Sequence, residues 1–89
     1  MKAIVTVIGK DKVGITATVC TLLAQNNINI LDITQTILQD NFTMVMLVDL
    51  SACPLAMGDV ARVLDEAGRA QELSIRIQRE DIFSAMHRI

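Results

Sequence analysis

The segment that decides the fold runs from Ile4 to Gln25 and reads IVTVIGKDKVGITATVCTLLAQ. It opens with a β-rich run that has apolar side chains on both faces, the pattern of a central strand. Its second half has apolar residues at helical spacing, namely Ile15, Val19, Leu22 and Leu23. The segment therefore predicts a strand over residues 2–8, a short polar loop, and a helix over residues 13–25.

Three more strand patterns and a second helix follow. Residues 28–38 alternate apolar and polar side chains, as a half-exposed edge strand does. A tight turn at residues 39–41 leads into residues 42–50, which are apolar on both faces. A helix follows from near Pro54, and residues 73–78 alternate like a second edge strand.

This order of elements predicts an α+β fold, a ferredoxin-like βαββαβ sandwich. Right-handed crossovers place both helices on one face of a four-stranded antiparallel sheet, with the first and third strands in its centre. Those are the two strands with apolar residues on both faces, so the periodicity and the topology agree. The sheet face away from the helices then needs cover from the C-terminal tail or from a second subunit.

We expect a single domain over residues 1–89, with a core over 2–78 and a tail over 79–89. Asp81 can cap a short C-terminal helix that adds to the sandwich. The apolar face of that helix would consist of Ile82, Phe83, Met86 and Ile89.

The composition limits the partners. Hydrophobic residues make up 52% of 89 residues, more than a monomer of this size hides easily, so we expect a homodimer or higher homo-oligomer. A net charge of -2 and only two aromatic residues exclude a nucleic-acid partner. The sequence has no apolar stretch of about 18 residues, so we expect no membrane span. Cys20 and Cys53 fit small buried residues in a reducing cytoplasm, and we expect a cytoplasmic protein.

No group of residues points to catalysis, a metal or a cofactor. His87 is the only histidine, which excludes a histidine-based catalytic pair and a multi-histidine metal site. Asp32 and Asp49 are lone carboxylates on strands, and the methionines fall in core positions. An acylphosphatase-type activity would need an arginine in the first loop, which has lysines only. We predict that the chain is not an enzyme and has no cofactor.

The loop GKDKVG, residues 9–14, is the candidate binding site. Backbone N–H groups at a helix start are unpaired and carry partial positive charge, so they favour a carboxylate or phosphate. Gly14 would let a ligand approach that backbone closely. A purely structural interpretation stays open, in which Asp11 caps the helix, Gly14 makes a tight bend, and both lysines are solvated charges.

In the arrangement of Gly9, Asp11 and Gly14 the chain resembles the ACT domains, whose first strand runs into a G-x-D-x-x-G loop that opens the first helix. The resemblance covers residues 2–78. The tail is similar to that of small stand-alone prokaryotic ACT proteins, related to the ACT units of glycine-cleavage regulators and formyltetrahydrofolate hydrolases. Many members have proline before the second glycine, where this chain has Val13, so its helix start is less rigidly fixed.

The resemblance implies a regulatory, dimeric module that binds an amino acid or a similar metabolite where the first loop of one subunit meets strand two of its partner. The implied ligand-binding residues are Asp11, Lys12, Val13, Gly14 and Ile15 of one chain and Asn29, Ile30, Leu31 and Asp32 of the other.

In our leading hypothesis the ligand carboxylate binds the Gly14 and Ile15 amides, helped by Lys10 or Lys12. Its ammonium meets Asp11 or Asp32. The alternative is a protein-interaction or dimerisation module without a ligand.

Overall fold

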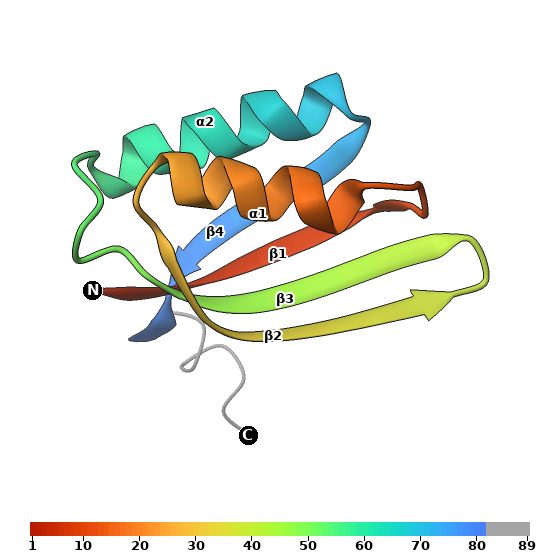
Figure 1. The fold of residues 1–89 in the computed structure, drawn as a ribbon, viewed down its shortest axis with the longest axis horizontal. Helices are drawn as coiled ribbons and strands as arrows, with labels where there is room; N and C mark the ends of the chain where they lie inside the picture. The colour runs from red at the N-terminus through yellow and green to blue at the C-terminus, as the bar shows by residue number, and fades with distance from the viewer. Residues whose placement is uncertain (82–89) are drawn as a thin grey trace.

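A computed structural model describes residues 1–81, and the predicted C-terminal helical face, residues 82–89, lies outside them. The elements follow the predicted order (Figure 1): β1 Lys2–Lys10, α1 Ile15–Gln25, β2 Asn29–Leu38, β3 Asn41–Asp49, α2 Met57–Ala70 and β4 Leu73–Arg79.

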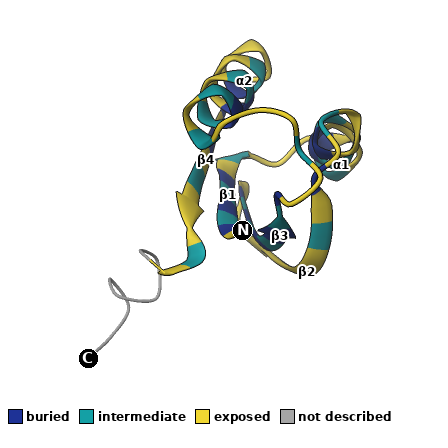
Figure 2. Cartoon of the chain, turned by 90° about the vertical axis from the view of Figure 1, so that its left-hand side faces the viewer, coloured by how far each residue is buried: buried dark blue, intermediate teal, exposed yellow. Residues whose placement is uncertain are grey.

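The four strands form one antiparallel sheet in the order β2-β3-β1-β4. This confirms that the first and third strands are central and that the second and fourth are edges. Both helices cover the same face of the sheet, and among residues 1–81 no layer lies on the other face (Figure 2). The predicted ferredoxin-like sandwich is therefore confirmed. Neither helix of residues 1–81 is long and apolar enough to cross a membrane.

The core lies between the sheet and the helices. Alternate residues of β1 and β3 point toward the helices and are almost fully buried, while α1 and α2 each contribute one apolar stripe. Burial of a large apolar side chain stabilises a fold by about 1.5–3 kcal/mol, so this layer holds the sandwich together. Its largest fully buried side chains are those of Val5, Val7, Val19, Leu23, Met44, Met46, Val48, Val60 and Leu64.

Three backbone features set the boundaries of α1 and the hairpin. Gly14, with φ 88°, is the N-cap of α1, so the helix begins at Ile15 rather than at the predicted Val13. Asn27 follows α1 with φ 57°, which matches the predicted stop because asparagine tolerates the left-handed region. Gln39 has φ 59° and turns β2 into β3.

The second helix begins later than its sequence suggested. Pro54 lies in the loop, and the backbone N–H groups of Asp59 and Val60 both donate to the carbonyl oxygen of Ala56. Ala56 is extended, with ψ 157°, so the first helical turn closes on it and α2 starts at Met57.

We call the sheet face away from the helices the open face. Its apolar residues lie on the two central strands: Ile4 pairs with Leu47, Thr6 with Val45, and Ile8 with Thr43. Ile8 is 49% exposed, and the others are half-buried. The open face therefore carries an apolar stripe that needs cover, as the sequence predicted.

Candidate functional site

The loop between β1 and α1 is fixed at both sides. The backbone N–H of Asp11 donates to the carbonyl oxygen of Asp40 in the β2–β3 turn, over 2.8 Å. The ammonium of Lys12 donates to the carbonyl oxygen of Gln71, which caps the C-terminal end of α2, also over 2.8 Å. The loop thus lies at the hairpin end of the sheet, between the hairpin and the end of α2 (Figure 1).

Gly14 has both properties that the sequence left as alternatives. Its φ of 88° is in the left-handed region, where side chains with a Cβ are strained. A Cβ built on Gly14 would meet no heavy atom within 4 Å, so the space in front of the start of α1 is open. The glycine therefore sets the backbone and also leaves room for a ligand.

The positive end of α1 has no acidic partner among residues 1–81. The first bond inside the helix runs from Thr18 N–H to the Gly14 carbonyl, which leaves the amides of Ile15, Thr16 and Ala17 at the helix start. No side chain of the described chain caps them, and no acidic residue lies in the first turn. The first turn of α2, by contrast, contains Asp59. The start of α1 thus favours an anion.

The structure changes the roles of the charged loop residues. Asp11 is not the helix cap that one interpretation assumed, because Gly14 occupies the N-cap. Lys12 already stabilises the C-terminal end of α2, where a cation is favoured. Lys10 pairs with Asn41 at the end of β1 and alternates onto the open face, away from α1. Val13 is fully exposed beside Gly14.

The second predicted group, Asn29 to Asp32, forms the start of β2. Ile30 pairs with Val48 and Asp32 with Leu47, so the strand bulges at Leu31. A bulge bends the strand and redirects its side chains. Asp32 points to the open face, and its Oδ1 accepts a 2.8 Å hydrogen bond from the backbone N–H of Ile33.

The two predicted groups lie at opposite ends of β2 within one chain. The loop lies beside Asp40, next to the last residue of β2, Leu38. Asp32 is six residues from Leu38, which corresponds to about 20 Å at the rise of a strand. The hydroxyl of Thr16 reaches Gln35 Oε1, over 3.4 Å, so the start of α1 lies beside the middle of β2. One chain therefore does not bring the predicted residues together.

The outer edge of β2 is exposed along nearly all of its length, with Ile30 half-buried (Figure 2). As an edge strand of ten residues it presents unpaired backbone groups, a template for another strand. Large apolar side chains also gather there: Leu38 is 72% exposed and Ile37 52%. Leu31 and Ile33 are exposed as well.

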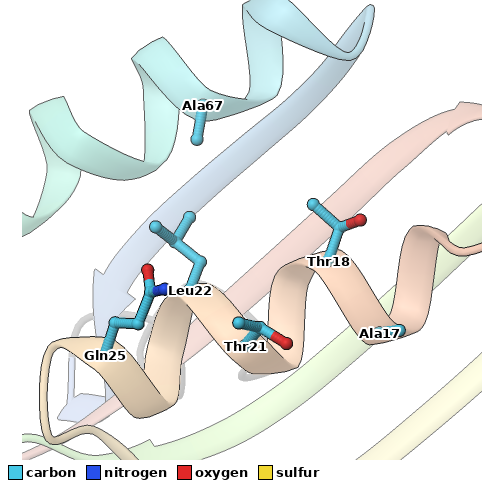
Figure 3. Close-up of a pocket in the computed structure, with 6 residues that line it drawn as sticks. All are labelled: Ala17, Thr18, Thr21, Leu22, Gln25 and Ala67. Carbon is cyan, nitrogen blue, oxygen red and sulfur yellow. The ribbon is translucent and has the colours of Figure 1, made fainter.

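Sequence reasoning missed a groove of about 400 Å³ between the two helices. Figure 3 shows Leu22 of α1 and Ala67 of α2 pointing toward one another across it. The remaining lining is small or polar and comes from α1: Ala17, Thr18, Thr21 and Gln25. Only the three-dimensional spacing of the helices creates it, so no sequence pattern could have located it.

Titratable groups gather only loosely in residues 1–81, and no three of His, Cys, Asp and Glu are close enough to hold a metal ion. Asp49 is a carboxylate at the end of β3. The hydroxyl and backbone N–H of Ser51 donate to its carboxylate, over 2.6 and 2.9 Å, and lower its pKa. The N-terminal ammonium lies 3.7 Å away. This cluster ties the start of β1 to the end of β3, so its role is structural.

Comparison with known proteins agrees with the fold. The family model described as ACT domain matches residues 2–78. A UPF0237 protein of Clostridium acetobutylicum is 56% identical over 89 residues, which cover both chains completely. A UPF0237 protein of Methanopyrus kandleri is 47% identical over 88 residues, 99% of this chain and 98% of the relative.

Solved structures give the same result. An ACT domain protein from Streptococcus pneumoniae is 40% identical and superposes with a TM-score of 0.84 over 98% of each chain. A putative glycine cleavage system transcriptional repressor is 25% identical, with a TM-score of 0.70 over 86% of this chain and 44% of its own. A formyltetrahydrofolate deformylase from Pseudomonas syringae shares the fold, with a TM-score of 0.76 at 22% identity, over 88% of this chain and 27% of the enzyme.

Proposed function

Because the chain belongs to the ACT domain family, whose members are generally regulatory ligand-binding modules rather than enzymes, we propose that it senses an amino acid or a similar small metabolite as a homodimer. The observation that carries this proposal is the open, uncompensated start of α1 at Gly14, which lies beside an exposed apolar strand edge. The binding site needs residues from two chains.

Pairing of two β2 edges about a two-fold axis would unite the two halves of the site. Such an interface is self-complementary, and adjacent edge strands join antiparallel. If the axis passes near Thr34, the middle of β2, then each β2 residue faces a residue of the partner strand such that the two residue numbers add up to 68. Asp32 of the partner subunit then faces Thr36, and Leu31 of the partner subunit faces Ile37. Neighbouring strands lie about 4.8 Å apart, so Leu31 of the partner subunit comes close to the hairpin end of the sheet, where the loop lies, while Asp32 of the partner subunit lies on the open face.

Each end of an amino acid then has a matching group. The carboxylate would accept hydrogen bonds from the backbone amides at Gly14 and Ile15, which the dipole of α1 favours. The ammonium would pair with Asp11 of the loop, because Asp32 of the partner subunit lies on the open face, away from α1. Neither lysine is required, which agrees with the bond from Lys12 to the end of α2.

A ligand bound between two subunits is also a regulator. It stabilises the paired state relative to separate chains, and by linkage it makes dimerisation depend on its concentration. A dimer that pairs through β2 without any ligand would be an interaction module instead, and ligand binding distinguishes the two.

A thermal-shift screen against the proteinogenic amino acids and one-carbon metabolites tests the proposal. A ligand at about 100 times its dissociation constant stabilises the native state by about 2.7 kcal/mol. The Val13→Glu variant is the matched control. Val13 is fully exposed, so its replacement changes no packing, and the glutamate adds a negative charge at the start of α1. We expect a shift in the native protein that Val13→Glu abolishes. No shift at millimolar concentration for any compound would favour the interaction module.

A further inference from the structure

The open face of the sheet is a second apolar surface, separate from the β2 edge. Its stripe runs along β1 and β3 from the Ile4–Leu47 pair, over Val45, to Ile8. Polar residues flank it on both edge strands: Arg76 pairs with Thr6 on one side, and on the other Thr34 pairs with Val45. An apolar stripe with polar borders is typical of a surface that another segment covers.

We propose that residues 82–89 of the same chain cover this stripe as a short amphipathic helix. The pattern of apolar residues supports a helix, since Ile82, Phe83, Met86 and Ile89 recur at helical spacing. Glu80 and Asp81 already have helical conformation at the end of the described chain. Two acidic residues at a helix start are favoured by its dipole.

The dimensions of the helix match those of the stripe. Eight helical residues are about 12 Å long, and the four residue steps from Ile4 to Ile8 along β1 span about 13 Å. A helix is about 10 Å wide with its side chains, which covers two strands at a spacing of about 4.8 Å. β1 and β3, the two strands that carry the stripe, are neighbours in the sheet.

The chain also leaves the sheet at the correct place. Gln78 pairs with Ile4 and Arg79 with Ala3, so β4 ends beside the first residue of the stripe. The helical turn at Glu80 follows Arg79 directly, so the tail leaves the sheet at the end of the stripe and needs no long linker. A tether this short makes the chain's own tail the favoured occupant over the tail of a second copy.

The groove between α1 and α2 is the competing apolar surface. It lies in the helix layer, on the other side of the sheet from the stripe, and Leu22 and Ala67 supply its apolar walls (Figure 3). A tail that binds there would have to pass around the sheet. The two surfaces can be distinguished with one cysteine in the tail and one cysteine on either surface.

Cross-linking with a short bismaleimide tests the assignment. In a Cys20→Ala, Cys53→Ala background, Met86→Cys is combined either with Thr6→Cys on the open face or with Thr18→Cys in the groove. Circular dichroism and melting confirm that each variant is folded, and Thr43→Cys is a second open-face position should Thr6→Cys not fold. Mass spectrometry separates adducts within one chain from adducts between chains.

We expect about tenfold more intrachain adduct with Thr6→Cys than with Thr18→Cys, because a tethered and docked cysteine has a high effective concentration. Equal yields or an excess for Thr18→Cys would overturn the proposal in favour of an undocked tail or the groove. An adduct only between chains would assign the stripe to the partner's tail, and no adduct in folded protein would exclude the tail as its cover.

Discussion

Replacement of Gly14 by alanine isolates the effect of the backbone angle at the candidate site. Gly14 and Gly58 are a matched pair, because a Cβ at either position meets no heavy atom within 4 Å. They differ in conformation: Gly14 has φ 88°, whereas Gly58 lies in the first turn of α2. Any difference between the two Gly→Ala variants therefore comes from the backbone and not from packing.

The left-handed conformation costs an L-residue about 1–2 kcal/mol. Alanine also restricts the unfolded chain, which stabilises the fold by about 0.4–1 kcal/mol. Gly14→Ala should therefore lower the free energy of unfolding by about 1 kcal/mol net, whereas Gly58→Ala should raise it by about 0.5 kcal/mol. At about 4–8 °C per kcal/mol for a domain of this size, the two melting temperatures should differ by about 6–12 °C.

Urea and thermal unfolding at one fixed protein concentration measure both variants, since the stability of a dimer depends on concentration. Gly14→Asn is a further control, because asparagine tolerates positive φ better than alanine and should lose less. If Gly14→Ala were as stable as Gly58→Ala, the strained helix start described here would be wrong.

Three more predictions concern packing, charge and the strand edge. A Cβ at Gly68 would lie 2.8 Å from the backbone oxygen of Leu73, so Gly68→Ala should lose about 1–3 kcal/mol in urea unfolding, against the usual gain of alanine in a helix. Hydrogen bonds from Ser51 lower the pKa of Asp49 in the fold, so their stabilisation is present above 3.8, the ordinary pKa, and is lost as the pH falls through the lower folded value. Ser51→Ala should thus lose less stability on acidification than the native protein; an unchanged pH dependence would contradict this. Ile37→Lys places a charge on the exposed β2 edge and should yield a monomer in sedimentation; an intact dimer would assign pairing to another surface.

The fold followed from the sequence because its period was distinct in each element. The strands β1 and β3 are apolar on both faces and proved central, while alternation in β2 and β4 marked the edges. The end of α1 at Gln25 was also predicted, and the positive φ of Asn27 just after it fits the local rule for asparagine. The start of α2 did not, because Pro54 is compatible with both a loop and a first helical turn, and only the bonds to Ala56 decide between them.

The candidate site was predictable only in part. The spacing of Gly9, Asp11 and Gly14 located the loop, yet the partner of Lys12 is the end of α2, 59 residues away, which no local pattern indicates. Gly9 illustrates the same limit. A Cβ there would clash with the side chain of Leu73, so the first glycine of the motif allows close packing against β4.

The central claim, a binding site built from two chains, is tested most directly by mixing two defective variants. Val13→Glu damages the loop, and Leu31→Glu places a charge on the β2 segment that would face the loop of the partner subunit. Each variant alone should fail to bind the amino acid that gives the largest thermal shift. In a mixed dimer, one of the two sites combines the intact loop of one chain with the intact β2 of the other. Random mixing should thus restore about a quarter of the native binding capacity in calorimetry. No restored binding, with mixed dimers present, would show that each site lies within a single chain and would contradict the account.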